Sequence, residues 1–250
     1  MSSKRSQPSP HALSTEASAS ADSLPTPAVR DALYAQFARI GQAIANPTRL
    51  HLLSLLEQGE KTVETLTRES GHPFATVSAH LKVLRDAHLV ETRRNGRHVI
   101  YRVANDDTFH LGSTLRNVAL RALPEVRELA ETYYHSPSTM AQWDARELMK
   151  AVQRCEVILV DLRPVEEFNA GHLPQARSLP FAELERRLNE LPSDQPVVAY
   201  CRGAYCVMGV RGVATLRAHG IQAQRLPAGV ADWRSQGFPI EADHPPISSQ

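Results

Sequence analysis

The chain has 250 residues, of which 42% are hydrophobic and 22% charged, and its formal net charge at pH 7 is +1. This length allows two modest domains with separate cores, and the near-neutral charge excludes a polyanion-binding surface over the whole molecule. No apolar run approaches the roughly 20 residues that span a bilayer, and no signal-peptide segment is present, so we expect a cytoplasmic protein without a membrane partner. The 3 cysteines are an odd number, which does not suggest a secreted disulfide framework.

The first half is predicted to be helical and to end in a β-hairpin. Residues 1–26 are rich in Ser, Pro and Ala and are expected to be a disordered tail. Start signals at Thr26-Pro27, Asn46-Pro47 and Thr62 precede segments with apolar residues at helical spacing. The predicted elements are helices at 27–44, 47–59, 63–70 and 74–87, a hairpin of 90–94 and 97–103 around Asn95-Gly96, and a long helix from about 107 to 134 with a break at Pro124.

The fourth helix and the hairpin carry a local positive charge. Between Phe74 and Arg102 there are six basic residues and two acidic ones. A helix fits the major groove of DNA, and lysine and arginine contacts with phosphates set affinity and register, although a solvated charged face is the alternative. The residues predicted to contact DNA are Thr76, Ser78, Ala79, His80, Lys82, Arg85, Arg93, Arg94 and Arg97.

The stretch TVSAHLKVLRDAHLVETRRNGRHVIYRV, residues 76–103, closely resembles the recognition helix and wing of the ArsR/SmtB family of dimeric repressors. IANPTRLHLLSLL, residues 44–56, resembles that family's second helix. The resemblance implies a mainly α winged helix-turn-helix domain over residues 27–135, which forms a homodimer and binds an inverted-repeat operator in double-stranded DNA. Metal-sensing members of the family place cysteines on or near the third helix, and this domain contains none, so we expect no metal and no other cofactor.

The second half follows a predicted linker at Ser136-Pro137-Ser138 and alternates helix and strand signals. Such alternation is typical of an α/β domain with a parallel sheet. The predicted helices lie near 143–153, 181–190, 206–218 and 228–236, and the predicted strands at 157–160, 196–200 and 222–226.

A reactive cysteine is predicted where one of these strands ends. Cys201 to Cys206 reads Cys-Arg-Gly-Ala-Tyr-Cys and follows the apolar run Val197–Tyr200. A cysteine between a buried strand and a helix meets free backbone amides and the positive helix end, which lower a thiol pKa and favour the nucleophilic thiolate. Cys201 is therefore the predicted catalytic residue, in an active-site loop formed by Arg202, Gly203, Ala204, Tyr205, Cys206 and Val207.

The run VILVDLR at 157–163, then Glu167-Phe168, Gly171-His172-Leu173-Pro174 and the Cys201 loop together resemble a single rhodanese domain. The match spans residues 138–242 and precedes a short tail at 243–250. It implies a Cys201 persulfide, formed from a sulfane-sulfur donor such as thiosulfate, polysulfide or a low-molecular-weight persulfide. Asp161 and Arg163 are possible supports of the site, and more often serve the family as a structural pair than as catalysts.

Cys206 stands where many thiosulfate-using rhodaneses carry a basic residue. The sequence leaves two roles open for it. It is either a small buried residue at a helix start, or a thiol that resolves a Cys201 persulfide into a disulfide or polysulfide and so makes a redox switch.

Three functions follow from this pairing of modules. The first is a DNA-binding repressor whose rhodanese domain senses or transfers sulfane sulfur, which the cysteine-free DNA module favours. The second is a sulfurtransferase enzyme with an accessory DNA-binding domain. The third is an arsenate- or phosphate-handling site, which the short, sulfur-type length of the loop disfavours.

Overall fold

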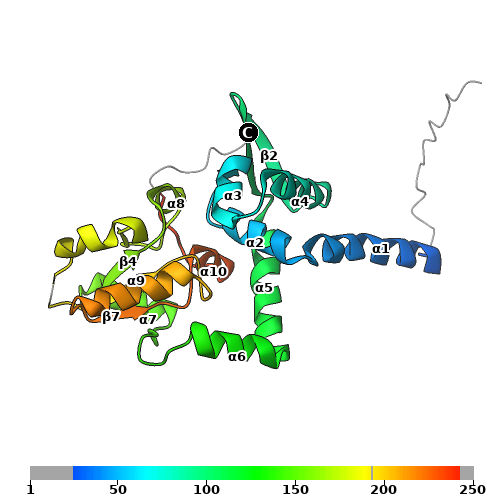
Figure 1. The fold of residues 1–250 in the computed structure, drawn as a ribbon. Coiled ribbons are helices and arrows are strands. Elements are labelled where there is room, and N and C mark those ends of the chain that lie inside the picture. The colour runs from blue at the N-terminus through cyan, green and yellow to red at the C-terminus, as the bar shows by residue number, and fades with distance from the viewer. Residues whose placement is uncertain (1–24, 193, 243–250) are drawn as a thin grey trace, which may run out of the picture. The chain divides into compact units, whose positions relative to one another are not determined.

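The computed structural model describes residues 25–192 and 194–242 (Figure 1). The predicted tails at 1–26 and 243–250 lie outside these residues, except for Pro25 and Thr26. The chain divides into two compact units, residues 1–38 and residues 39–250. The described part of the first unit is mostly helical and carries the ring contact between Tyr34 and Phe37, whose centroids are 5.8 Å apart. Within the described ranges, no helix is long and apolar enough to cross a membrane.

The first half of the chain is helical, as predicted, with a small antiparallel sheet. Its elements are α1 Pro27–Ile44, α2 Pro47–Leu56, β1 Lys61–Thr62, α3 Val63–Ser70, α4 Phe74–Asp86, β2 Val90–Asn95, β3 His98–Val103, α5 Asp106–Ala122 and α6 Pro124–Tyr133. The predicted caps are present: Asn46 accepts a hydrogen bond from the amide of Arg49 at 3.2 Å, and Thr62 accepts one from Thr65 at 3.2 Å. Gly71, with φ of 71°, ends α3.

The predicted hairpin and the predicted helix break are also confirmed. Gly96 has a φ of 58° in the turn between β2 and β3, a backbone conformation that glycine adopts without strain. Pro124 separates α5 from α6 because it has no amide hydrogen to continue the helix. Strand β1 was not predicted: it has two residues and exists only because it pairs with β3, which gives the order β1-β3-β2.

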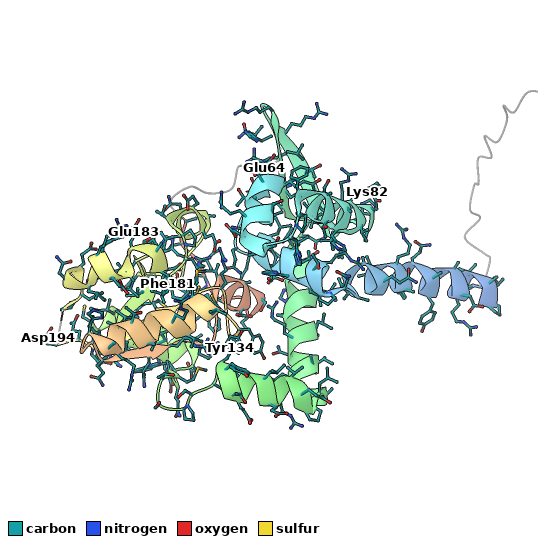
Figure 2. The ribbon with its side chains drawn as sticks, in the orientation of Figure 1. Glu64, Lys82, Tyr134, Phe181, Glu183 and Asp194 are labelled. Carbon is teal, nitrogen blue, oxygen red and sulfur yellow. The ribbon has the colours of Figure 1, made fainter. Side chains whose placement is uncertain are left out.

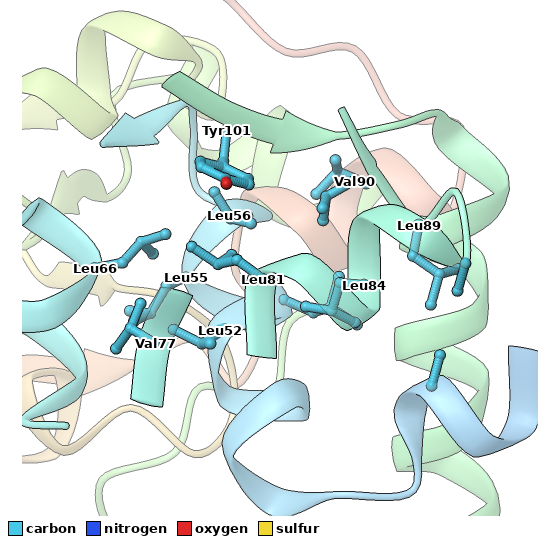
Figure 3. Packing of buried hydrophobic residues seen from close by; sticks show 14 of the residues in the cluster. Leu52, Leu55, Leu56, Leu66, Val77, Leu81, Leu84, Leu89, Val90 and Tyr101 are labelled. Carbon is cyan, nitrogen blue, oxygen red and sulfur yellow. The ribbon is translucent and has the colours of Figure 1, made fainter. Parts of the chain in front are cut away.

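The helices α2, α3 and α4 share one core with this sheet (Figure 3). Val77, Leu81 and Leu84, predicted as the inner face of α4, have no exposed surface. They pack in one buried cluster with leucines of α2 and α3 and with Tyr101 of β3. This packing fixes α4 by its apolar face and leaves its polar face outward.

The second half is the predicted parallel α/β fold. Its elements are α7 Ala145–Gln153, β4 Ile158–Asp161, α8 Val165–Ala170, β5 Arg177–Ser178, the 3-10 helices η1 Phe181–Arg186 and η2 Leu188–Glu190, β6 Val197–Tyr200, α9 Val207–Ala218, β7 Ala223–Arg225 and α10 Val230–Ser235. All pairs in the sheet are parallel, in the order β5-β4-β6-β7. The segment predicted as a helix at 181–190 forms 3-10 turns, because Phe181 and Leu184 pack on one core at a spacing of three.

Side chains alternate between the two faces of this sheet. Leu159 and Val198 belong to one core cluster, whereas Ile158 and Val197 belong to the other. Asp161 at the end of β4 pairs in register with Tyr200 at the end of β6. The carboxyl ends of parallel strands face the same edge, so the segment that begins at Cys201 is presented at that edge.

Candidate functional site

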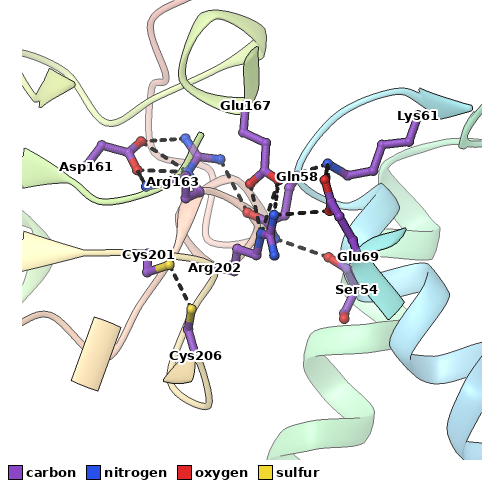
Figure 4. A network of polar contacts seen from close by, with 10 residues as sticks. All are labelled: Ser54, Gln58, Lys61, Glu69, Asp161, Arg163, Glu167, Cys201, Arg202 and Cys206. Carbon is purple, nitrogen blue, oxygen red and sulfur yellow. Dashed lines mark hydrogen bonds and ion pairs between the residues drawn. The ribbon is translucent and has the colours of Figure 1, made fainter. Parts of the chain in front are cut away.

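The two cysteines of the predicted loop face each other. Cys201 follows β6 directly and is 1% exposed, while Cys206 is half-buried and forms the N-cap of α9. Between them the chain turns at Gly203, whose φ is 117°, and the amide of Cys206 donates to the carbonyl of Gly203 at 3.3 Å. The two Sγ atoms are 2.7 Å apart (Figure 4). A disulfide bond is about 2.05 Å long, so the sulfurs are close enough for sulfur exchange between them but are not bonded to each other.

The pKa values of the two cysteines are shifted in opposite directions. The hydrogen bond between the two sulfurs, together with the backbone amides of Arg202, Gly209 and Met208, lowers the pKa of Cys206 to about 6, although burial opposes this shift. The hydrogen bond to Cys206, followed by burial, raises the pKa of Cys201 well above its ordinary value. The sequence led us to expect the low pKa at Cys201. In the structure the lowered pKa belongs to Cys206, because its hydrogen bond with Cys201 and the backbone amides of Arg202, Gly209 and Met208 favour its thiolate.

Backbone packing and a buried arginine hold the loop in place. A Cβ atom on Gly229 would lie 2.7 Å from the amide nitrogen of Gly203 and 2.8 Å from the carbonyl oxygen of Cys201, so only glycine fits there. Arg225, which is 2% exposed, donates from Nη1 to the carbonyl of Ala204 at 2.8 Å. Sequence reasoning missed Arg225, and its only signal was a charged residue at the end of a predicted buried strand.

Arg202, next to Cys201, points into a network of charged side chains rather than toward the sulfurs (Figure 4). Its Nε donates to Glu167 Oε2 at 3.0 Å, and its Nη2 donates to Glu69 Oε2 on α3 at 3.1 Å. Lys61 Nζ lies 2.9 Å from Glu167 Oε1 and 3.3 Å from Glu69 Oε2. We call these four residues, Lys61, Glu69, Glu167 and Arg202, the interdomain network.

The network is buried and electrically balanced, with two cations and two carboxylates. Burial by itself would raise the pKa of Glu167, but the hydrogen bonds and charges of Arg202 and Lys61 outweigh it and lower that pKa. Glu167 therefore stays ionised at neutral pH. A change in the position of Arg202 alters the environment of both carboxylates, one of which belongs to a helix of the first domain.

Asp161 and Arg163 form a second buried pair, with Arg163 Nη2 at 2.7 Å from Asp161 Oδ2 and no exposed surface on either side chain. Arg163 also donates to the carbonyl of Gly171 at 2.6 Å and to Gln58 Oε1 at 3.3 Å. The pair thus ties the loop after β4 to α8 and to the residues that follow α2. Among the described residues, Asp161 and Arg163 form no hydrogen bond or ion pair with a cysteine or with a loop residue between 202 and 207.

A cavity of about 790 Å³ opens beside the cysteine loop. Its walls come from α2 and α5 of the first domain and from the Cys201–Cys206 loop and α10 of the second, and they include Ser54, Arg116, Asn117, Tyr205, Cys206 and Asp232. Arg116 spans it by contacting Glu57 and Asp232, each at 3.3 Å. Another cavity, of about 560 Å³, is lined by Trp143 and Met140 and by none of the loop residues.

The residues predicted to contact DNA lie on α4 and on the hairpin. Ala79, Lys82 and Arg85 are exposed on α4, whereas Thr76, Ser78 and His80 are half-buried. Figure 2 labels Lys82 on this helix. Burial, followed by the charges of Arg49 and His72, lowers the pKa of His80 and favours its neutral form. On the hairpin, Arg93, Arg94 and Arg97 are exposed.

Two of these cations already have acidic partners. Lys82 pairs with Asp86 at 2.7 Å, and Arg93 pairs with Glu60 at 2.6 Å. Such exposed pairs are weak and exchange readily for phosphate contacts. In the described part of the chain, no group of three or more His, Cys, Asp and Glu side chains is arranged to hold a metal ion.

The fold and the site define a winged helix-turn-helix regulator that carries a cysteine-loop α/β domain. Residues 46–92 match the arsR family of bacterial regulatory proteins, and residues 144–236 match the rhodanese-like domain. The chain belongs to the ArsR family of helix-turn-helix transcriptional regulators, in a form with a C-terminal rhodanese domain.

One relative matches most of the chain, and others match one of its two parts. The HTH-type transcriptional regulator Rv0324 of Mycobacterium tuberculosis is 42% identical over 214 residues, which cover 86% of this chain and 94% of the relative. A sulfurtransferase of Allochromatium vinosum is 34% identical over 88 residues, covering 35% of this chain and 80% of that protein. The homodimeric winged helix-turn-helix domain of a possible ArsR-family regulator from Mycobacterium bovis is 38% identical, with a TM-score of 0.39, and covers 41% of this chain and 95% of that structure.

Proposed function

We propose that this transcriptional regulator responds to sulfane sulfur: a persulfide on Cys201 changes the affinity of the DNA-binding domain for its operator. The observation that carries the proposal is the contact between Arg202, the residue after the reactive cysteine, and Glu69 on α3 of the helix-turn-helix. A ligand shifts a conformational equilibrium only if it interacts differently with the two states. A negative persulfide in the loop would do so by attracting the guanidinium of Arg202 away from its carboxylates.

The expected size of the response follows from the network. Coupling free energies between two sites are typically about 1–3 kcal/mol, which corresponds to roughly a 5- to 150-fold change in affinity. Arg202 and Glu69 have side chains that are 19% and 17% exposed, so solvent screens their contact less than it screens a surface pair. One rearranged contact in this setting is sufficient for a coupling in that range.

The arrangement supports a regulator more than a housekeeping sulfurtransferase. Efficient turnover of an anionic donor such as thiosulfate needs an available cation at the loop, and the Arg202 guanidinium is engaged by Glu167 and Glu69. The likeness to a sulfurtransferase supports sulfur chemistry at the cysteine loop, and a sensor uses the same chemistry. The persulfide itself is the signal in this proposal.

The DNA-bound form is proposed to be a homodimer in the cytoplasm that reads an inverted repeat. Large apolar side chains remain exposed on α1 and α6, among them Leu33, Phe37, Leu129 and Tyr133. Isolated exposed apolar residues are common, but several on the same helices favour association. The exposed arginines at the hairpin tip and the outward face of α4 would contact phosphates and bases of each half-site.

Operator binding with and without polysulfide tests the proposal. A duplex selected from random DNA by the full-length protein serves as the operator, and fluorescence anisotropy gives its Kd. Treatment of the wild type is expected to change Kd by at least about fivefold. Cys201→Ser should abolish the change, and Cys155→Ser, which removes an exposed cysteine, should preserve it. An equal response in Cys201→Ser would refute the proposal.

A further inference from the structure

The two cysteines differ in access from the cavity beside the loop. Cys206 lines this cavity, as do its neighbours Tyr205 and Val207, whereas Cys201 does not line it and is 1% exposed. A donor that approaches through the cavity therefore meets the sulfur of Cys206 first. The sulfur of Cys201 lies 2.7 Å behind it, at the end of β6.

Local chemistry at Cys206 agrees with this order. Its Sγ lies 2.7 Å from the Sγ of Cys201, and this contact, together with the backbone amides of Arg202, Gly209 and Met208, lowers its pKa. These interactions stabilise a thiolate, which is the nucleophilic form. Cys201 has the opposite environment, since burial and its neighbour favour the protonated thiol.

The cavity is much larger than a small inorganic donor needs. A volume of about 790 Å³ lies within the range of about 300–1,000 Å³ typical of sites for organic ligands. Hydrogen-bonding side chains occupy its walls on both domains, among them Ser54, Asn117 and Gln236. Arg116, Glu57 and Asp232 add charges of both signs. Such walls suit a polar molecule that itself bears amino and carboxylate groups.

We infer that this cavity binds a persulfide carried on an amino-acid-derived thiol, and that Cys206 is the entry thiol, which takes the outer sulfur and passes it to Cys201. The inference rests on the proposed function and names the donor class and the order of transfer at the same site. It reverses the role that the sequence suggested for Cys206, which was to resolve a persulfide formed first on Cys201.

Each step of the transfer is balanced. The Cys206 thiolate attacks the outer sulfur of the donor persulfide R–S–SH, the donor S–S bond breaks, and R–S⁻ leaves and takes up a proton. Cys206 then carries Sγ–SH. The Cys201 sulfur attacks that outer sulfur, the bond to Cys206 Sγ breaks, and the Cys201 proton passes to the released Cys206 thiolate. No external oxidant or reductant is consumed, because both steps exchange one S–S bond for another.

Single-cysteine variants distinguish the two possible orders of sulfur transfer, through Cys206 first or directly to Cys201. Full-length wild type, Cys201→Ser and Cys206→Ser are exposed to glutathione persulfide, quenched at short times by alkylation, and mapped by peptide mass spectrometry. Serine keeps a hydroxyl that can donate a hydrogen bond to the remaining sulfur. Cys201→Ser should gain one sulfur on Cys206 at close to the wild-type rate, whereas Cys206→Ser should gain sulfur on Cys201 at least about tenfold more slowly. Rapid modification of Cys201 in Cys206→Ser, with Cys206 unmodified in Cys201→Ser, would overturn the inference.

A cavity variant tests the donor class. Asn117 is exposed on α5 and lines the cavity, so Asn117→Trp should fill part of it without disturbing a core. We expect this variant to slow modification by glutathione persulfide at least about tenfold, while inorganic tetrasulfide modifies it as fast as it modifies the wild type. Equal rates for both donors in both proteins would overturn the role of the cavity. If neither donor adds sulfur to the wild type, the proposed function itself fails.

Discussion

Removal of the Arg202 side chain should lower the folding stability by an amount that can be worked out from the contacts of the interdomain network. In Arg202→Ala, Glu167 loses its hydrogen bonds to the guanidinium and keeps its ion pair with Lys61. The side chain of Glu167 is 3% exposed, so water cannot replace the lost contacts. Glu69 loses its 3.1 Å contact as well. The variant therefore leaves the buried Glu167 and the half-buried Glu69 facing the buried Lys61.

The magnitude follows from this imbalance. Removal of one partner of a buried ion pair costs about 3–5 kcal/mol, and the remaining Lys61 places the expected loss of stability near about 3 kcal/mol. For a chain of this size, about 1 kcal/mol shifts Tm by roughly 2–4 °C, so the expected fall in Tm is about 6–12 °C. The Arg202 charge lowers the pKa of Glu167, so the stability it provides is present at neutral pH and is lost as pH falls through that lowered pKa.

Calorimetry at neutral pH and at about pH 3.5 checks both the size of the fall in Tm and its dependence on pH. The difference in Tm between wild type and Arg202→Ala should narrow once Glu167 is protonated. Arg187→Ala is the matched control: Arg187 also contacts two carboxylates, Glu183 and Glu190, but its side chain is 33% exposed and theirs are 43% and 51% exposed. Its Tm should change by about 2 °C or less. If the two variants lower Tm equally, or if the gap is the same at both pH values, the network is not the buried unit described above.

Three further variants test other parts of the molecule. Burial, partly offset by Arg116, raises the pKa of Glu57 to about 7, so folding stability should fall as pH rises from about 4.5 to 7. In Glu57→Gln, Tm measured across that pH interval should fall less than in the wild type. Arg94→Ala at the hairpin should weaken operator binding and reduce the slope of log K against log salt by about 0.9, and an unchanged slope would exclude a phosphate contact. Gly229→Ala should displace the Cys201 loop and slow its persulfidation at least about tenfold, because the added Cβ would lie 2.7 Å from loop backbone. The control Gly41→Ala should leave the rate of persulfidation unchanged, because a Cβ there meets nothing within 4 Å.

Local signals explain why so much of the fold could be predicted. Asn46 and Thr62 cap their helices, Gly96 turns the hairpin and Pro124 breaks the long helix, and each acts through its own backbone chemistry. The elements missed are the six-residue helix α8 and two strands whose existence depends on distant partners. Strands β1 and β5 have two residues each and form only by pairing with β3 and β4.

The functional site likewise has a part that local sequence predicts and a part that depends on distant residues. The cysteine loop was predictable because a strand end, a helix start and two cysteines lie within a few positions. The partners of Arg202 on α3 and of Arg225 on the loop were not, since Arg202 and Glu69 are 133 positions apart. The lowered pKa at Cys206 depends on its contact with the Cys201 sulfur and on nearby backbone amides, and spacing along the chain does not determine either.

Sulfur loading and operator affinity measured on the same samples test the central claim most directly. Full-length protein is titrated with glutathione persulfide, and each sample is divided between intact-mass analysis and operator anisotropy. A sulfur-responsive regulator predicts that Kd changes in proportion to the fraction of protein carrying sulfur and reaches a change of at least about fivefold at full loading. Complete loading of the cysteine pair with an unchanged operator Kd would contradict it.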